Sequence, residues 1–171
     1  MTALRVWPEN PNAAVAAIGV SVVGCTLGIM VVDALFRSRL TAEAASFSGA
    51  HEWATTLLMI SKATKDELLG RLVIVGGMVA FIGVAFQKKE LNIPELTIIF
   101  VTAQVIILLP QLSTPTDFTE FLYDALRYVS PGILWGWLYW RYGLVTALLG
   151  HAATHVVLDP ALHAFFGATR Q

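Results

Sequence analysis

Long apolar runs constrain this chain more than any other feature of its sequence. A helix that crosses the roughly 30 Å hydrocarbon core of a bilayer needs about 20 mostly apolar residues. Residues 13–36 meet this length, with Asp33 near the end of the run, where its carboxylate can reach the interface, and Arg37 directly after it. The whole chain agrees, since 56% of its 171 residues are hydrophobic and only 13% are charged. We therefore expect a protein that folds in a membrane.

Four further segments have the pattern of membrane spans. They cover residues 68–86, 94–109, 117–143 and 144–158. Thr64 and Glu67 have the spacing of a capping box that would begin the second span, and Pro94 can open the third helix. Asp117 and Glu120 form a similar start for the fourth span, and Ser130-Pro131-Gly132 should kink that helix. Asp159-Pro160 should end the last span.

Residues 40–63 differ from these runs because charged residues interrupt every apolar stretch in them. Their apolar residues can form one face of an amphipathic helix that lies at the membrane interface. The predicted fold is thus all-α, a polytopic membrane helix bundle of about five transmembrane helices plus an interfacial amphipathic helix. We divide it into residues 1–63, with the first span and the interfacial segment, and residues 64–171, with a four-helix core and a short tail.

Charge and cysteine content exclude other classes of protein. The chain has 11 basic and 12 acidic residues and a net charge of −1, so it lacks the cationic excess of nucleic-acid-binding proteins. Its single cysteine, Cys25, has no partner for an internal disulfide or a thiolate metal cluster. We expect an integral, multi-pass protein of the bacterial inner membrane, whose partners are the lipid bilayer and either other membrane proteins or a membrane-embedded peptide.

Ionisable and amide side chains within the spans are the strongest functional signal. Such groups are expensive at membrane depth and usually face the interior of a bundle, where they pair with one another. Glu67 and Arg71 are four residues apart on one predicted helix, and His151 and His155 have the same spacing on another. Together with Asp66 and Gln104, they form a set of six candidates that three helices can direct toward one interior site.

The order of these residues resembles a known family. The segments Asp66-Glu67-Leu68-Leu69-Gly70-Arg71, Phe100-Val101-Thr102-Ala103-Gln104 and His151-Ala152-Ala153-Thr154-His155 are similar to the Glu-Glu-x-x-x-Arg, Phe-x-x-x-His and His-x-x-x-Asn motifs of the CAAX prenyl protease and bacteriocin-processing (CPBP) intramembrane proteases. The run from Gly136 through Gly143 to His151 also looks like the tight helical hairpin before the last motif of that family. The resemblance covers roughly residues 64–158.

The resemblance implies an intramembrane endopeptidase and a role for each candidate. Asp66 stands where the family has the glutamate that activates a water, and Glu67 and Arg71 match the pair that organises the site. His151 matches the histidine that stabilises the oxyanion, and His155 replaces the asparagine beside it. Gln104 replaces the histidine that handles protons, and an amide cannot take up a proton near neutral pH. We therefore expect weak proteolysis or none by the chain alone.

The residues also allow two functions of other classes. Asp66, Glu67 and Arg71 can serve as a helix cap and an ordinary helical ion pair, and Gln104 as a hydrogen-bonding contact between helices. In that case the chain is a non-catalytic scaffold or accessory subunit of a larger membrane complex. His151 or His155 could instead ligate a tetrapyrrole or a metal ion, although a zinc site needs three or four protein ligands. No cofactor can be named from the sequence.

Overall fold

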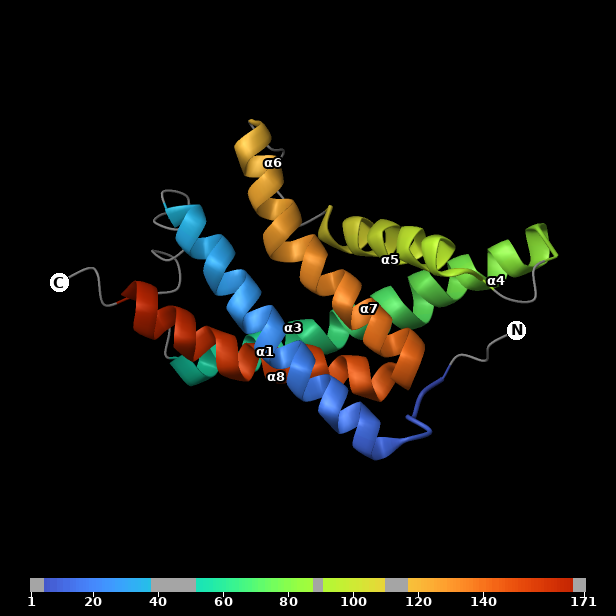
Figure 1. The fold of residues 1–171 in the computed structure, drawn as a ribbon, viewed down its shortest axis with the longest axis horizontal. Helices are drawn as coiled ribbons and strands as arrows, with labels where there is room; N and C mark the ends of the chain where they lie inside the picture. The colour runs from blue at the N-terminus through green and yellow to red at the C-terminus, as the bar shows by residue number, and fades with distance from the viewer. Residues whose placement is uncertain (1–4, 38–51, 88–90, 110–116, 168–171) are drawn as a thin grey trace.

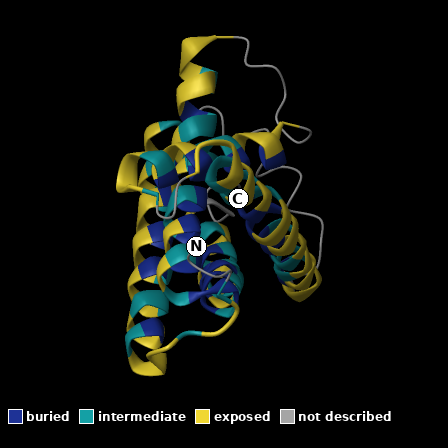
Figure 2. Cartoon of the chain, turned by 90° about the vertical axis from the view of Figure 1, so that its right-hand side faces the viewer, coloured by how far each residue is buried: buried dark blue, intermediate teal, exposed yellow. Residues whose placement is uncertain are grey.

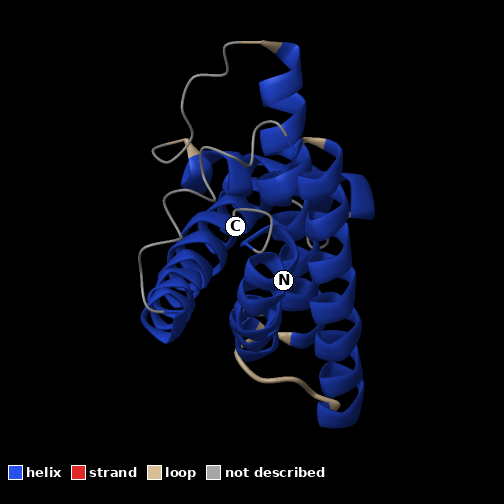
Figure 3. Cartoon of the chain, turned by 90° about the vertical axis from the view of Figure 1, so that its left-hand side faces the viewer, coloured by secondary structure: helices blue, strands red, loops and turns tan. Residues whose placement is uncertain are grey.

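The computed structural model describes residues 5–37, 52–87, 91–109 and 117–167, and every regular element in them is a helix (Figures 1 and 3). Three of these helices are long and apolar enough to cross a membrane, namely Pro11–Leu35, Trp53–Ala85 and Leu144–Phe165. A shorter apolar helix covers Ile93–Leu108. The all-helical, membrane-type architecture predicted from the sequence is confirmed.

Helix α1 (Pro11–Leu35) begins as its sequence dictates. The Asn10 side chain accepts a hydrogen bond from the Ala13 N–H at 3.1 Å, and Pro11 occupies the first turn, where its missing N–H costs nothing. Only a narrow stripe of α1 is buried, and it includes Ser21, Cys25 and Asp33. The remaining faces expose apolar side chains. Figure 2 shows that exposed residues cover the outer surfaces of the bundle.

Asp33, near the end of α1, is buried in an ion pair that was not predicted from the sequence. Its carboxylate is fully buried and accepts hydrogen bonds from the Arg127 guanidinium at 2.7 and 3.3 Å and from the Tyr123 hydroxyl at 3.2 Å. The short Asp side chain can stay at this depth because a cation and a hydroxyl replace its water. This ion pair joins α1 to the segment that precedes α7.

The predicted helix start at Thr64 is wrong. Helix α3 (Glu52–Glu67), the π-helical segment η1 (Leu68–Val75) and α4 (Gly76–Ala85) are continuous, and Thr64 donates its hydroxyl hydrogen to the Ile60 carbonyl at 2.9 Å within this helix. Residues 40–51 of the expected interfacial segment lie outside the described residues. The rest of that segment runs directly into the second span because α3 packs along α8, where Thr56 and Ala63 are buried. The division at residues 63 and 64 therefore falls inside a helix.

Helix α5 (Ile93–Leu108) begins at a capping box that was not predicted from the sequence. The Asn92 side chain accepts from the Glu95 N–H at 3.0 Å, and the Glu95 carboxylate accepts from the Asn92 N–H at 3.0 Å. Pro94 lies in the first turn, as predicted.

The fourth predicted span is also helical throughout. It consists of α6 (Phe118–Asp124), the π-helical segment η2 (Ala125–Val129) and α7 (Ser130–Tyr142), and Asp117 caps its start as predicted. The helix is not broken at Ser130-Pro131-Gly132, where a kink was expected, and the π-helical segment η2 lies directly before these residues. A π-helical turn just before a proline accommodates the ring and the missing hydrogen bond without ending the helix.

Helix α8 (Leu144–Leu162) is the centre of the bundle and packs against α1, α3 and α7 (Figure 1). Gly143 makes the tight turn from α7 with φ of 99°, a conformation that favours glycine. The carbonyls of Arg5 and Val6 accept hydrogen bonds from the first N–H groups of α8. The predicted end at Asp159-Pro160 is wrong, because the helix continues through Pro160 into the π-helical segment η3 (His163–Gly167).

Candidate functional site

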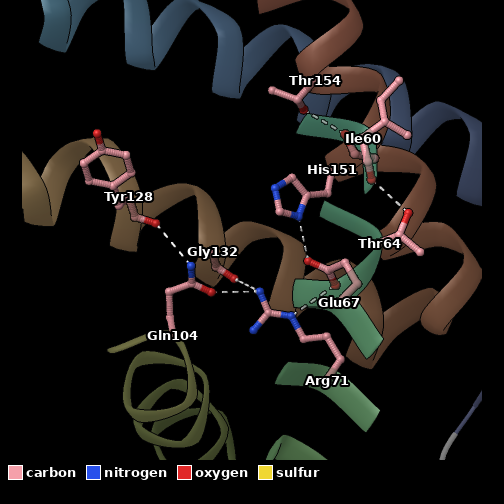
Figure 4. Close-up of polar contacts among 10 residues, drawn as sticks. Ile60, Thr64, Glu67, Arg71, Gln104, Tyr128, Gly132, His151 and Thr154 are labelled. Carbon is pink, nitrogen blue, oxygen red and sulfur yellow. Dashed lines mark hydrogen bonds and ion pairs between the residues drawn. The ribbon is translucent and has the colours of Figure 1, made fainter. Parts of the chain in front are cut away.

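The site begins with an ion pair at the junction of α3 and η1. The Arg71 Nε–H donates to the Glu67 Oε2 at 3.2 Å, one helical turn away (Figure 4). Each residue is only 1% exposed. Two charges this deep are stable only if the rest of their hydrogen-bonding capacity is also satisfied.

Arg71 connects this helix to two others. Its Nη2 donates to the Gln104 Oε1 of α5 at 3.2 Å and to the Gly132 carbonyl of α7 at 2.7 Å (Figure 4). The Gln104 amide nitrogen donates in turn to the Tyr128 carbonyl at 3.4 Å. Gly132 makes this close approach possible, because a Cβ at that position would collide with the Gln104 side chain. Gln104 is thus held at both ends.

His151 completes the network from α8. Its Nδ1 lies 3.0 Å from the Glu67 Oε1, which joins residues 84 positions apart in the sequence. Because an ionised carboxylate can only accept, Nδ1 carries the proton and Nε2 carries the lone pair. The Trp135 indole stacks on the imidazole, with ring centroids 3.5 Å apart and planes 15° from parallel. This stacking fixes the plane of the imidazole.

The structure brings four of the six predicted residues into direct contact. These are Glu67, Arg71, Gln104 and His151. Asp66 is half-buried beside them and interacts electrostatically with Lys62 and His151. His155 turns away from Glu67 and places its Nδ1 3.2 Å from the Asp159 Oδ1.

Buried hydrogen-bond donors next to this network were not predicted. Within the part of the chain that the structure describes, the Arg71 Nη1, the Trp135 Nε1 and the Tyr139 hydroxyl have no hydrogen-bond partner. This role of α7 was missed from the sequence, although Gly132, Trp135 and Tyr139 have the three- and four-residue spacing that places them on one helical face. That spacing was the available signal.

The described residues contain no group of three or more His, Cys, Asp or Glu side chains that could hold a metal ion. The fold and the site define an all-helical protein. It has three candidate membrane-crossing helices and a buried network of four polar side chains. No family model, curated protein or solved structure matches the chain.

Proposed function

We propose that this chain is an intramembrane endopeptidase of the CPBP kind with low intrinsic turnover, acting on membrane-embedded or lipidated peptides in the bacterial inner membrane. The single observation that carries the proposal is the buried hydrogen bond between Glu67 and His151. It joins a residue of the first motif to a residue of the last. A carboxylate that orients an imidazole is a common way to build a general base.

The orientation of His151 gives it a different role from the one the resemblance implies. With Nδ1 donating to Glu67, Nε2 can accept a proton from a water molecule, whose oxygen then attacks the peptide carbonyl. The Glu67 carboxylate stabilises the resulting imidazolium, and Arg71 holds that carboxylate in place. The proton on Nε2 then passes to the leaving amine as the carbon–nitrogen bond breaks.

The unpaired donors next to the network suit a second requirement of this reaction, which is to stabilise negative charge on the oxygen of the peptide carbonyl. The Arg71 Nη1 and the Tyr139 hydroxyl are buried, and the guanidinium acts electrostatically on that hydroxyl. Donors that are already oriented and shielded from water stabilise negative charge that develops on a carbonyl oxygen. Gln104 does not serve as a second base, because an amide cannot take up a proton near neutral pH, and it instead binds Arg71 and Tyr128. Slow turnover follows because Gln104 stands where the family has a proton-handling histidine.

The proposal is tested with purified protein and prenylated and unmodified transmembrane peptides, with product detection by mass spectrometry. We expect slow cleavage by the wild type, loss of cleavage in Glu67→Gln and His151→Gln, and a gain of about 10²-fold or more in Gln104→His, the lower end of what a positioned acid–base group contributes. Glu95→Gln is the matched control, since glutamine also completes a capping box. No cleavage by either the wild type or Gln104→His would reject the proposal.

A second candidate is the non-catalytic scaffold. It is favoured by the pairing of Glu67 and Gln104, because both oxygens of the Glu67 carboxylate and both ends of the Gln104 amide already have partners. For a scaffold we expect a stoichiometric membrane partner to remain bound in mild detergent, together with no cleavage by any variant. A tetrapyrrole or metal protein that uses His151 or His155 would instead absorb visible light after purification.

A further inference from the structure

Helix α8 carries an ionisable side chain at every fourth position along part of its length. His151, His155 and Asp159 have this spacing, and His163 continues it at the start of η3. Residues four apart lie one above the other on the same face of a helix. The four side chains therefore form a row along a helix that is a candidate membrane span.

Contacts join the members of this row to the buried site. Glu67 Oε1 is 3.0 Å from the His151 Nδ1, and His155 Nδ1 is 3.2 Å from the Asp159 Oδ1. The two imidazoles lie between these contacts, with ring centroids 5.4 Å apart and planes 30° from parallel. No hydrogen bond joins the two rings within the described residues, so a proton that passes between them needs a carrier such as one water molecule.

Exposure rises steadily along the row. The side chains of Glu67, His151, His155 and Asp159 are 1%, 9%, 20% and 22% exposed, and His163 is on the surface. The row thus begins in the interior and ends at the surface. Packing alone does not require three ionisable side chains on one apolar helix, and chains of Asp, Glu and His inside membrane proteins commonly carry protons.

We propose that His151, His155 and Asp159 form a proton-transfer path between the buried Glu67 and the surface near His163. The path does not depend on peptide hydrolysis. In the inward direction, the Asp159 carboxylate takes a proton from a hydronium ion, which leaves water. While Asp159 is protonated, His155 holds its own proton on Nε2, and its Nδ1 accepts the proton of Asp159. The Nε2 proton of His155 then moves to a bridging water, which gives a proton to the His151 Nε2, and His155 is left in the Nδ1–H tautomer that donates to the ionised Asp159. Each transfer moves one proton, and the charge arrives as an imidazolium beside the Glu67 carboxylate.

A competing route to His151 runs along the neighbouring helix. Asp66, Glu67 and Arg71 all act electrostatically on His151 from α3 and η1, and Lys62 and Lys65 act on Asp66. Protons could therefore reach His151 through half-buried Asp66 without using α8. Substitutions along both routes are needed to tell them apart.

The fluorescence of Trp135 reports the protonation of His151, because the two rings are stacked. A protonated imidazole quenches the emission of an indole in contact with it, so quenching after a rapid drop in pH reports the arrival of a proton at His151. Stopped-flow fluorescence in nanodiscs would record this signal, and subtraction of the Trp135→Phe trace would remove the other four tryptophans.

We expect Asp159→Asn and His155→Asn to slow the quenching by about 10²-fold, the lower end of the effect of a positioned proton-transfer group. Asparagine keeps a polar side chain at both positions but cannot carry a proton, and circular dichroism would verify the fold of each variant. Asp124→Asn on α6 is the matched control and should keep the wild-type rate. Unchanged rates in either folded variant, slowing by Asp66→Asn alone, or no quenching in the wild type would overturn the proposal.

Discussion

At the scale of single residues, Arg71 holds the network together. It binds a carboxylate on its own helix, an amide on α5 and a carbonyl on α7. A lysine could not make these contacts together, because its ammonium lacks the planar fork of a guanidinium. Because both charges are buried, each is stable only while the other is present. Removal of one charge leaves the other without water and without a partner.

The first prediction concerns this pair. Arg71→Met should lower the free energy of unfolding by about 3–5 kcal/mol, because it leaves the Glu67 carboxylate buried and uncompensated. The double variant Glu67→Gln/Arg71→Met should recover part of that loss, since no charge then remains. Thermal denaturation in detergent measures both, with exposed Arg141→Met as the control. An Arg71→Met protein as stable as the wild type would contradict the prediction.

The second prediction at this scale concerns Asp33, whose ion pair with Arg127 joins α1 to η2. Asp33→Asn keeps the volume but removes the charge that Arg127 binds at 2.7 Å. A hydrogen bond to a charged group contributes about 1.5–3 kcal/mol, so we expect a loss of that size in the same denaturation assay. Glu9→Gln, which removes an exposed ion pair with Arg5, should have a smaller effect. Equal effects of the two substitutions would argue against the assigned role of Asp33.

At the scale of helices, local sequence signals predicted some helix starts correctly. They failed where packing between helices determines whether a helix continues. The cap at Asp117 and the proline at Pro94 act within one turn, so the sequence was sufficient for both. Thr64 and Pro160 carry equally strong local signals, yet the helices continue through them. At Thr64 the reason is contact between α3 and α8, which stabilises an unbroken helix and is not visible in either sequence segment.

Glycines set the distance between α5 and α7, and this gives the third prediction. A Cβ on Gly136 would lie 2.9 Å from the Phe100 ring, whereas a Cβ on Gly77 of α4 would meet no atom within 4 Å. Gly136→Ala should therefore cost about 1–3 kcal/mol by overpacking. Gly77→Ala should stabilise its helix by about 0.5–1 kcal/mol. A denaturation series that ranks the two variants in the reverse order would show that α5 and α7 are not in close contact.

At the scale of the whole molecule, the site depends on contacts that no local pattern predicts. Periodicity placed Glu67 beside Arg71, but the contact between Glu67 and His151 spans 84 positions. The cost of ionisable groups at membrane depth and the resemblance to a family both suggested that these residues share a site. The contact of His155 with Asp159 has the same four-residue spacing as Glu67 and Arg71, and it was missed because the helix was predicted to end at Asp159.

The last prediction tests how the long helix lies in a bilayer. The helix Trp53–Ala85 has 33 residues, a length of about 50 Å at 1.5 Å per residue, which exceeds the roughly 30 Å of a hydrocarbon core. Its two ends should therefore reach opposite sides of the membrane. In a Cys25→Ala background, cysteines at Glu52 and Gln87 should react with an impermeant maleimide from opposite faces of sealed vesicles. A cysteine at Ile93 should label from the same face as Gln87, because only a short connection separates α4 from α5. Labelling of Glu52 and Gln87 from one face would mean that this helix does not cross the bilayer.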